Sequence, residues 1–448
     1  MFDLIVIGAG PGGYEAALHA AKKGKKVALF ERSAIGGTCL NTGCIPTKTL
    51  LKSAHVLAQT RLAASFGVKV PDPTFSLAKA QERKNKIVAT LGKGVETSLK
   101  KAGVEIIAAS AQILAPGKVE AAGKTYETAN ILIATGSKPA RPPIPGIDGA
   151  NVLDSTGVLN LTEAPDTMVI IGGGVIGIEF ASFFADIGTI VTVVEMLPAI
   201  AGNFDNDIRT RLLAALKRKD IIFHLSAKVT GIEGNTVKFT DAEGKALSVP
   251  GDVILNATGR VPVMDGLGLE KLNLDFTRRG ITTDDKGHTN LPGIWACGDV
   301  TGRCQLAHVA TREGIVAVEN MFGNPQTMRY TAIPAVVYTD PEAAGVGKTE
   351  EQLVAAGVPY KKTLMPMSIA GRYLVEFEGQ SGTVKVLTGE KHGEILGIHM
   401  IGGICGEHIF AGAMMIENEM RIRDITEIIF PHPTLVEALK ETLNHAGK

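Results

Sequence analysis

A glycine-rich strand–turn–helix pattern occurs twice in this chain, and the repeat constrains the fold more than any other feature. In the first copy an apolar run precedes Gly8, Gly10 and Gly13, and a second apolar run ends at Glu31. Gly8 permits a tight turn, Gly10 lets the backbone approach a pyrophosphate at a helix N-terminus, and Gly13 allows close packing of helix on strand. Glu31 can accept hydrogen bonds from ribose hydroxyls.

The second copy carries Gly172, Gly174 and Gly177, followed by Glu195. One GxGxxG is weak evidence, because glycine-rich turns are common, but the interval from third glycine to acid is 18 residues in both copies. The repeat therefore predicts two dinucleotide-binding units of α/β type, the alternative being two ordinary strand–helix turns. A carboxylate at the end of the second strand favours a free 2′-hydroxyl, so Glu195 indicates NAD rather than NADP.

Each unit closes with an apolar strand and a short ATG phrase. The first phrase contains Thr135 and Gly136, and the second contains Gly259 and Arg260. A third apolar run leads into GIWACGDVTG, where Asp299 follows a glycine. An Asp at a strand end beside a nucleotide crevice can bind a ribityl or ribose hydroxyl. We predict that these five residues contribute to cofactor binding.

Two cysteines, Cys39 and Cys44, follow the first unit in the phrase GGTCLNTGCIPTK. Inert buried thiols are one interpretation, but three glycines around the pair predict a loop-rich site. A zinc site needs two further ligands at suitable spacing, and no second Cys/His pair supplies them, so we predict no metal. A redox disulfide needs only the pair and a group that stabilises a thiolate. The N-terminus of the helix expected after Cys44, running to about Gln59, provides that group.

A histidine between two prolines, His432, is the candidate for a general base. Glu437 follows five residues later, and a turn leading into a helix could bring its carboxylate back to the imidazole. A thiol substrate needs a base that works near neutral pH, which suits a His held by a carboxylate. From these residues alone, a structural hydrogen-bonding role for His432 remains an equal alternative.

The bulk properties exclude several other classes. With 448 residues the chain is too long for one hydrophobic core, so two to four domains are expected. Lys plus Arg and Asp plus Glu both total 46, which gives no support for nucleic acid or a membrane surface as the main partner. Five cysteines are not a secreted disulfide framework. No leader or membrane span is evident, and we expect a cytoplasmic protein.

Taken together, these motifs resemble those of the flavin-dependent pyridine nucleotide-disulfide oxidoreductases along nearly the whole chain. The matching phrases are GAGPGGY, GGTCLNTGCIPTK, ATGS, GGGVIGIE, ATGRVP, CGDV, QLAH, IPAVVYTDPEAAGVG and HPTLVE. Within that family the chain is most similar to the dihydrolipoamide dehydrogenase group. The resemblance implies an α/β fold with two Rossmann-like domains, which bind FAD and NAD, and a C-terminal α+β interface domain that forms a homodimer.

The resemblance also divides the chain into four regions. An FAD-binding domain with the cysteine pair would span residues 1–140, and an NAD-binding domain would span 141–261. A central segment, 262–328, would complete the FAD site, and the interface domain would span 329–448. The proline-rich run 139–145 would link the first two domains.

Roles for individual residues follow from the matching motifs. Cys39 would be the interchange thiol that meets the substrate, and Cys44 would face the flavin. Lys48 and Glu179 would pair near the flavin N5. The His432–Glu437 dyad would come from the other subunit. Further cofactor contacts are expected at Ala111 on the adenine side, at Asp299 on the ribityl chain, at Ala307 beside the isoalloxazine, and at Val229.

The implied reaction is the oxidation of dihydrolipoamide by NAD⁺. The lipoyl group would arrive on another protein, either the acyltransferase of a 2-oxo acid dehydrogenase complex or the lipoylated carrier of glycine cleavage. A glutathione-reductase-like, NADPH-dependent enzyme should carry basic residues after the second strand of the second glycine-rich unit. Glu195 at that position argues against such an enzyme. A non-catalytic structural flavoprotein could lose Cys39, Cys44 or His432 freely, yet all three are present.

Overall fold

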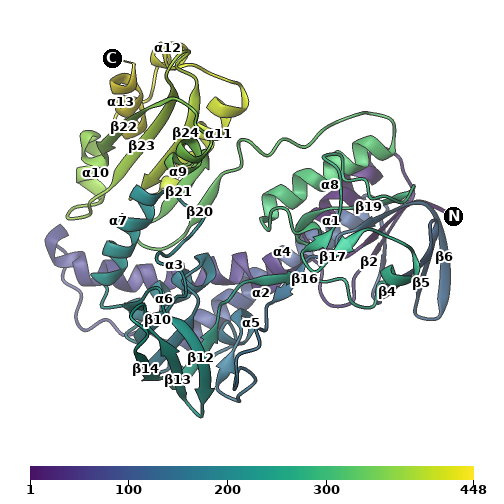
Figure 1. Cartoon of the computed structure of the whole chain (residues 1–448), viewed down its shortest axis with the longest axis horizontal. Coiled ribbons are helices and arrows are strands. Elements are labelled where there is room, and N and C mark those ends of the chain that lie inside the picture. The colour runs from purple at the N-terminus through teal and green to yellow at the C-terminus, as the bar shows by residue number, and fades with distance from the viewer. Residues whose placement is uncertain (448) are drawn as a thin grey trace.

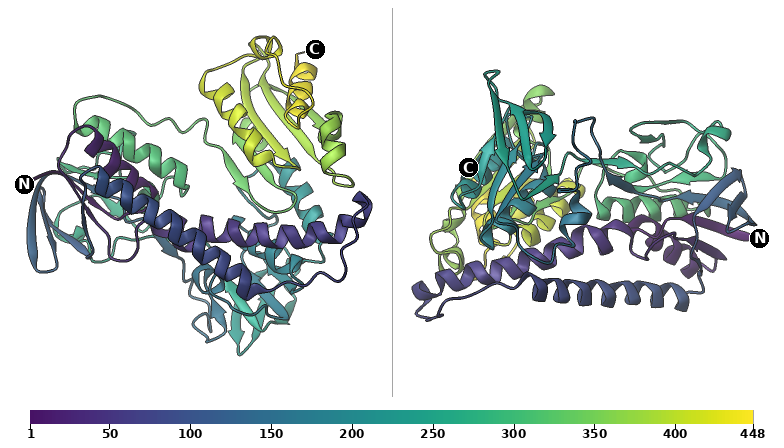
Figure 2. Two further views of the ribbon diagram at one scale, coloured as in Figure 1. Left: turned by 180° about the vertical axis from the view of Figure 1, so that it is seen from behind. Right: turned by 90° about the horizontal axis from the view of Figure 1, so that it is seen from below.

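The computed structural model describes residues 1–447, which form three lobes (Figure 1). Two lobes contain parallel sheets and the third contains an antiparallel sheet. Helix α3 (Cys44–Leu62) packs against α4 (Leu77–Lys101) and against α6 (Val175–Asp186), which belongs to the second lobe. The two long helices run beside each other beneath the lobes (Figure 2). The helix that begins at Cys44 therefore connects the first two lobes.

The first lobe is built on a seven-stranded sheet in the order β3-β2-β1-β6-β5-β4, with β19 paired to β6. The bounds are β1 Phe2–Ile7, β2 Val27–Phe30, β3 Glu105–Ile107, β4 Ala111–Ala115, β5 Lys118–Ala121, β6 Lys124–Ile133 and β19 Ile294–Ala296. Strand β1 pairs in parallel with β2 and β6, and its apolar residues from Leu4 to Ile7 are buried, as expected for a strand covered on both faces. Helix α1 (Pro11–Lys22) packs against α8 (Ala307–Met321).

The second lobe repeats this plan with a five-stranded parallel sheet in the order β11-β10-β9-β15-β8. The bounds are β8 Val152–Leu153, β9 Thr167–Ile171, β10 Ile190–Val194, β11 Ile222–His224 and β15 Val253–Asn256, with helices α5 Ser155–Val158 and α7 Asn206–Lys217. A separate antiparallel meander joins β12 Lys228–Glu233, β13 Thr236–Thr240 and β14 Ala246–Pro250. Phe180, Phe183 and Phe184 of α6 are almost completely buried in the core of this lobe.

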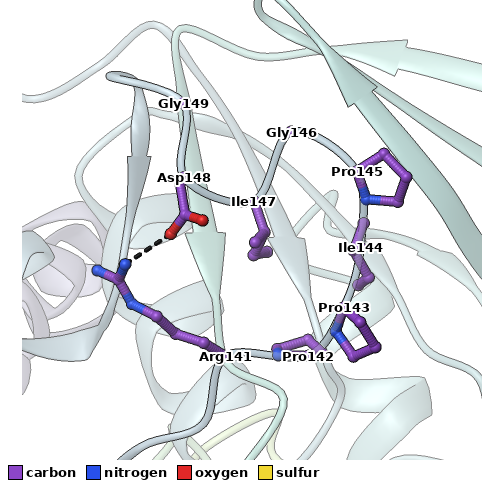
Figure 3. A pocket seen from close by; sticks show the side chains of 9 residues that line it. All are labelled: Arg141, Pro142, Pro143, Ile144, Pro145, Gly146, Ile147, Asp148 and Gly149. Carbon is purple, nitrogen blue, oxygen red and sulfur yellow. Dashed lines mark hydrogen bonds and ion pairs between the residues drawn. The ribbon is translucent and has the colours of Figure 1, made fainter.

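The two parallel-sheet lobes are also joined directly. Strand β7 (Ser137–Pro139) pairs antiparallel with β16 (Arg260–Pro262), so the strands that follow the two ATG turns form one two-stranded ribbon. The chain between the lobes curves around a cavity of about 570 Å³ that is open to solvent and is lined by residues 141–149 (Figure 3). Arg141 Nη1 donates to Asp148 Oδ1 at 2.6 Å across it. None of the predicted site residues is among those that line this cavity.

The third lobe is an antiparallel sheet with flanking helices. Its strand order is β20-β21-β24-β23-β22, with β20 Ala335–Val337, β21 Ala343–Gly347, β22 Tyr360–Pro366, β23 Thr383–Gly389 and β24 Ile395–Ile401. The helices are α9 Glu350–Ala355, α10 Gly371–Glu376, α11 Cys405–Glu417, α12 Ile422–Thr426 and α13 Glu437–Ala446. A long connection from α8 crosses to β20 (Figure 1). Helix α11 packs on β21 and β24, while α13 packs on β22 and β23.

The predicted α/β fold class is confirmed, and one local expectation is wrong. Cys39 lies on a short helix, α2 (Gly37–Thr42), where the glycines predict a loop. Strand β19 and helix α8, from the predicted central segment, pack in the first lobe. The bounds of the four domains stay predictions. Within residues 1–447, no helix is long and apolar enough to cross a membrane.

Candidate functional site

The first glycine turn has a backbone that only glycine fits at two positions. Gly8 has a φ of +102°, and a Cβ there would lie 2.4 Å from the carbonyl oxygen of Ala134. A Cβ on Gly13 would lie 1.9 Å from the carbonyl oxygen of Gly8. A Cβ on Gly10 would meet nothing within 4 Å, so open space lies beside this residue at the start of α1. The turn is a cradle in which a pyrophosphate can approach the backbone.

The second glycine turn reproduces this geometry at the start of α6. Gly172 has a φ of +111°, and a Cβ there would lie 2.5 Å from the carbonyl oxygen of Ala257. A Cβ on Gly177 would lie 2.1 Å from the oxygen of Gly172, whereas Gly174 borders open space. The match extends from the sequence spacing to the individual close contacts, so both turns are shaped for the same kind of ligand.

The acidic residue of each unit is fixed by backbone amides. Glu31 Oε2 accepts from the N–H of Ala9 at 2.8 Å, and its Oε1 accepts from the N–H of Ser33 at 2.8 Å. Glu195 makes the two equivalent hydrogen bonds at the second turn. Each carboxylate is thus held at the edge of its cradle with lone pairs left for ribose hydroxyls.

Asp299 is connected to both ATG turns by side-chain hydrogen bonds. It lies in the 3-10 turn η3 (Gly298–Thr301), and its Oδ2 accepts from Ser137 Oγ at 2.5 Å. Arg260 Nε donates to the same Ser137 oxygen at 2.7 Å. Thr135 Oγ1 donates to the carbonyl oxygen of Val263 at 2.6 Å. Ser137 was not singled out in the sequence, although it closes the ATGS phrase.

The other predicted cofactor residues lie on different elements. Gly136 and Gly259 have φ values of +70° and +112°, and both border open space. Ala307 is the first residue of α8. Ala111 begins β4 and Val229 lies in β12, and both side chains pack in hydrophobic clusters. Their contacts with a cofactor stay predictions.

The cysteine pair is held against the first glycine turn. Gly36 and Gly37 have φ values of +99° and +57°, and a Cβ on Gly37 would lie 2.6 Å from the Cα of Gly10. Helix α2 can therefore start directly beside the cradle, carrying Cys39, and Cys44 follows as the first residue of α3. Both sulfurs are free thiols in this structure. The pair lies beside the turn in which the first dinucleotide is expected.

The two thiols differ in their electrostatics. The hydrogen bond from the Cys39 side chain, together with the charge of Lys48, lowers the pKa of Cys44 to about 7, against the opposing effect of burial. The same hydrogen bond and burial raise the pKa of Cys39. Cys44 is therefore the sulfur that carries negative charge near neutral pH.

Lys48 and Glu179 form the ion pair that the sequence predicts. Lys48 lies one helical turn after Cys44 in α3, and its Nζ donates to both oxygens of Glu179 at 2.9 and 2.7 Å. The Glu179 side chain is 4 % exposed, so its charge is almost completely removed from water. The backbone N–H of Tyr338 also donates to Glu179, at 3.0 Å. Tyr338 lies in the recognised IPAVVYTDPEAAGVG phrase but was not singled out.

His432 and Glu437 also meet as predicted. His432 Nδ1 lies 2.9 Å from Glu437 Oε1, and Glu437 Oε2 accepts from the N–H of Thr434 at 2.9 Å. The hydrogen bond from Thr434 has the larger effect on Glu437 and lowers its pKa. The hydrogen bond with His432 lowers this pKa further. The His432 side chain is 79 % exposed. Helices α12 and α13, which flank it in the sequence, lie at the outer end of the third lobe, far from α2 (Figure 1).

No cluster of three or more His, Cys, Asp or Glu side chains in residues 1–447 is arranged to hold a metal ion.

Comparison with known proteins identifies the family. The model of the pyridine nucleotide-disulphide oxidoreductases matches residues 2–314, and that of their dimerisation domain matches residues 333–443. The chain belongs to the pyridine nucleotide-disulphide oxidoreductase family. It is 39 % identical to dihydrolipoyl dehydrogenase 3 of Pseudomonas aeruginosa, over 98 % of this chain and 97 % of that protein. It is 37 % identical to dihydrolipoyl dehydrogenase of Bacillus subtilis, with the same coverage of each chain.

Solved structures agree with this membership. LpdA from Mycobacterium tuberculosis superposes with a TM-score of 0.90 at 28 % identity, over 99 % of both chains. The HOCl-induced flavoprotein disulfide reductase RclA from Escherichia coli superposes with a TM-score of 0.86 at 29 % identity, again over 99 % of both chains.

The family membership settles several predictions. The resemblance to dihydrolipoamide dehydrogenases, the enzyme class of flavoprotein disulfide oxidoreductase, and the cofactors FAD and NAD are confirmed. The dimerisation domain supports the predicted homodimer. The lipoylated partners and the cytoplasmic location stay predictions, as do the roles of the individual site residues.

Proposed function

We propose that this oxidoreductase oxidises protein-bound dihydrolipoyl groups to lipoyl groups with NAD⁺, through the Cys39–Cys44 pair. The observation that carries the proposal is the position of this pair against the first glycine turn, with Lys48 one helical turn from Cys44. A thiol whose pKa is lowered to about 7, beside a dinucleotide cradle, suits exchange with a dithiol substrate.

The residues of the first cradle fit FAD. Helix α1 begins without a side-chain cap at Gly10, so its first N–H groups can face a pyrophosphate, and Glu31 is placed for a ribose. Asp299 presents a carboxylate for the hydroxyls of a ribityl chain. FAD, when bound, supplies a two-electron carrier between the thiols and NAD⁺.

The thiol exchange can be written with this chain's own residues. A base removes the proton from one substrate thiol, and the resulting thiolate attacks the Cys39 sulfur of the Cys39–Cys44 disulfide. The sulfur–sulfur bond breaks, and Cys44 leaves as a thiolate. The second substrate thiol loses its proton and attacks the substrate sulfur bonded to Cys39. The lipoyl disulfide closes, and Cys39 leaves with a proton returned by the base.

The charges around the pair favour this direction of attack. A leaving thiol of lower pKa departs faster, and Cys44 has the lower pKa of the two. Lys48 adds a positive charge near the sulfur on which negative charge develops. Cys39 therefore receives the substrate, while Cys44 holds the charge.

We assign the base to His432 of the partner subunit. In one chain the flanking helices lie far from α2 (Figure 1). The imidazole of His432 is largely exposed. Glu437 binds Nδ1, so Nε2 is the imidazole nitrogen left to accept a proton from the substrate. A homodimer could bring this nitrogen to the cysteine pair of the second chain.

The substrate is expected on a lipoylated protein, either the acyltransferase of a 2-oxo acid dehydrogenase complex or the carrier of glycine cleavage. Support comes from the relatives named dihydrolipoyl dehydrogenase, since a lipoyl arm is a dithiol that must be reoxidised after acyl or aminomethyl transfer. We place this reaction in the cytoplasm.

The test is turnover of the purified flavoprotein with dihydrolipoamide and NAD⁺, compared with glutathione disulfide and NADPH. We expect lipoamide formation to be much the faster reaction. Cys39→Ser should abolish it while leaving a yellow protein. Reduction of the native enzyme with dithiothreitol should produce a long-wavelength thiolate-to-flavin absorption. Faster glutathione turnover would overturn the assigned substrate, and absence of the long-wavelength band would overturn the assigned role of Cys44.

A further inference from the structure

Three segments that are distant in the sequence meet at the ion pair beside the cysteines. Lys48 comes from α3, Glu179 from α6, and Tyr338 from the residue that follows β20 in the third lobe. The Lys48 Nζ lies 4.6 Å from the centroid of the Tyr338 ring. The Tyr338 backbone N–H donates to Glu179 Oε1 at 3.0 Å. One residue of the dimerisation domain thus contacts both members of the pair.

These contacts hold the ammonium group of Lys48 from two sides. The Glu179 carboxylate binds it with both oxygens, and the aromatic face of Tyr338 attracts it because a cation within about 6 Å of a ring centroid is stabilised by the ring's negative face. Lys48 is a long and flexible side chain that is about one-third exposed, so without these contacts it could turn into solvent.

The position of this ammonium matters because its positive charge favours the thiolate form of Cys44. The charged or titratable side chains that act electrostatically on its sulfur include Cys39, Lys48, Glu179, Arg260 and Tyr338. The positive charge of Lys48 favours the Cys44 thiolate more than any other charge, whereas the negative charge of Glu179 disfavours it. A shift of Lys48 away from the sulfur would leave the buried carboxylate as the nearer charge.

We propose that Tyr338 is a positioning residue, whose ring holds the Lys48 ammonium beside Cys44 and so keeps Cys44 in its thiolate form. The inference rests on the proposed role of Cys44 in the thiol exchange. It gives the dimerisation domain a direct contact with the redox site of the same chain, in addition to the base that it is proposed to donate to the other subunit.

The experiment titrates the Cys44 thiolate in the flavoprotein. In a Cys39→Ser background the hydroxyl of Ser can still donate to Cys44, and Cys44 is the sole sulfur of the pair. Its thiolate is followed against pH by the long-wavelength flavin absorption and, independently, by the rate of iodoacetamide alkylation of Cys44, measured by mass spectrometry. Tyr338→Leu removes the ring, whereas Tyr338→Phe retains the ring and removes only the hydroxyl.

We expect Tyr338→Leu to raise the midpoint by about half a pKa unit, which is about a threefold decrease in the acid dissociation constant of Cys44, a size suited to one cation–π contact. In Tyr338→Phe the midpoint of the Cys44 titration should equal that of the parent Cys39→Ser protein. An unchanged midpoint in Tyr338→Leu, or an equal shift in Tyr338→Phe, would overturn the inference. Tyr338→Met is measured alongside, because its unbranched side chain fills the space if Leu prevents folding.

A double-mutant cycle separates an effect through Lys48 from a general loosening of the site. In a Lys48→Met background, Tyr338→Leu should cause no further shift, because the cation that the ring holds is absent. A second shift of the same size would overturn the proposed route. If the parent shows no long-wavelength band at any pH, the assignment of Cys44 to the flavin fails, while the alkylation midpoints still decide the role of Tyr338.

Discussion

The carboxylate of Glu195 accepts a hydrogen bond from the backbone N–H of Gly173 at 2.5 Å. Its other oxygen accepts from the N–H of Leu197 at 2.6 Å. Because the glycine turn and the end of β10 are joined in this way, the negative charge has a fixed place at the rim of the second cradle. Glu31 is fixed at the first cradle by the same two kinds of bond.

This fixed charge predicts selectivity for NADH over NADPH. A 2′-phosphate at the second cradle would meet the Glu195 carboxylate, whereas a 2′-hydroxyl would donate to it. We expect kcat/KM for NADH to exceed that for NADPH by more than tenfold, which corresponds to about 1.4 kcal/mol or more. Glu195→Ser should lower the NADH value about tenfold and raise the NADPH value, as measured by steady-state reduction of lipoamide.

Glu31 provides the matched control for this prediction, because it occupies the equivalent position in the first unit. Glu31→Ser should weaken retention of FAD, measured as flavin per chain, and leave the ratio of NADH to NADPH rates in the flavin-loaded fraction unchanged. A change of that ratio in Glu31→Ser, or an unchanged ratio in Glu195→Ser, would contradict the assignment of the two cradles.

The features that the sequence predicts well are those set by local backbone geometry. Gly8, Gly13 and their counterparts are needed because a Cβ would strike a neighbouring carbonyl, and this requirement leaves a fixed spacing in the chain. Helix α2 was missed because Gly36 and Gly37 resemble loop residues, although Gly37 packs closely on Gly10 and Gly36 packs closely on Leu40.

Contacts between segments far apart in the chain could not be predicted in this way. Tyr338 meets Glu179 and Lys48 only through the packing of three lobes, and no periodicity near residue 338 indicates such a contact. Ser137 likewise depends on the pairing of β7 with β16 before it can bridge Asp299 and Arg260. Family phrases mark these positions, but their partners come from the structure.

Lys48 is expected to contribute to stability as well as to thiol chemistry. Lys48→Met would leave the buried Glu179 carboxylate with the Tyr338 amide as its remaining hydrogen-bond donor among these contacts. Because the lysine itself is partly exposed, we expect a loss of about 1–3 kcal/mol in unfolding free energy, less than for a fully buried pair. Thermal unfolding of the flavin-loaded protein measures this loss.

The control for Lys48→Met is Lys52→Met, at an exposed position one turn further along α3. It should change stability by no more than about 0.5 kcal/mol. Lys48→Met should also raise the pKa of Cys44 above about 7, because the positive charge that favours the thiolate is lost. Equal stability of the two variants would show that the ion pair contributes little.

The exposed position of His432 predicts complementation between defective chains. Mixed dimers of one His432→Gln chain and one Cys39→Ser chain, isolated with two affinity tags, should regain about half of the native turnover, since one of the two sites then has both native residues. Each variant alone should be nearly inactive with dihydrolipoamide.

The reverse arrangement is the control. A chain that carries both His432→Gln and Cys39→Ser, paired with a native chain, should be nearly inactive, because each site then lacks one of the two residues. Half-native activity in this dimer, with none in the first, would place His432 and Cys39 of one chain in the same site and overturn the proposed exchange across the dimer.

A second buried ion cluster, between the second and third lobes, predicts how stability depends on pH. Lys385 of β23 is 0 % exposed, and its Nζ contacts Asp205, Asp207 and Glu350 at 2.6–2.9 Å. Burial opposes ionisation of Glu350, but its hydrogen bonds lower its pKa to about 2, and the bond from Lys385 has the largest effect among them. The pKa of Asp207 is also lowered. Both carboxylates are therefore stabilised in their charged form by folding.

The sign of the pH effect follows from these lowered pKa values. Glu350 contributes stability in full above its unfolded pKa, near 4.5, and loses it as the pH falls towards about 2. Lys385→Met leaves the carboxylates without their buried cation, and we expect a loss of about 3 kcal/mol or more at pH 7. The deficit should narrow below pH 4.5, because protonation removes the unpaired charges.

Lys362→Met is the matched control, since Lys362 lies 3.0 Å from Glu350 but is 42 % exposed. It should cost less than about 1 kcal/mol at pH 7. Thermal unfolding midpoints of the native, Lys385→Met and Lys362→Met proteins, all flavin-loaded, at pH 7, 5 and 4 measure these losses of stability. A Lys385→Met deficit that is equal to that of Lys362→Met, or that stays constant as the pH falls, would show that the buried cluster does not join the two lobes electrostatically.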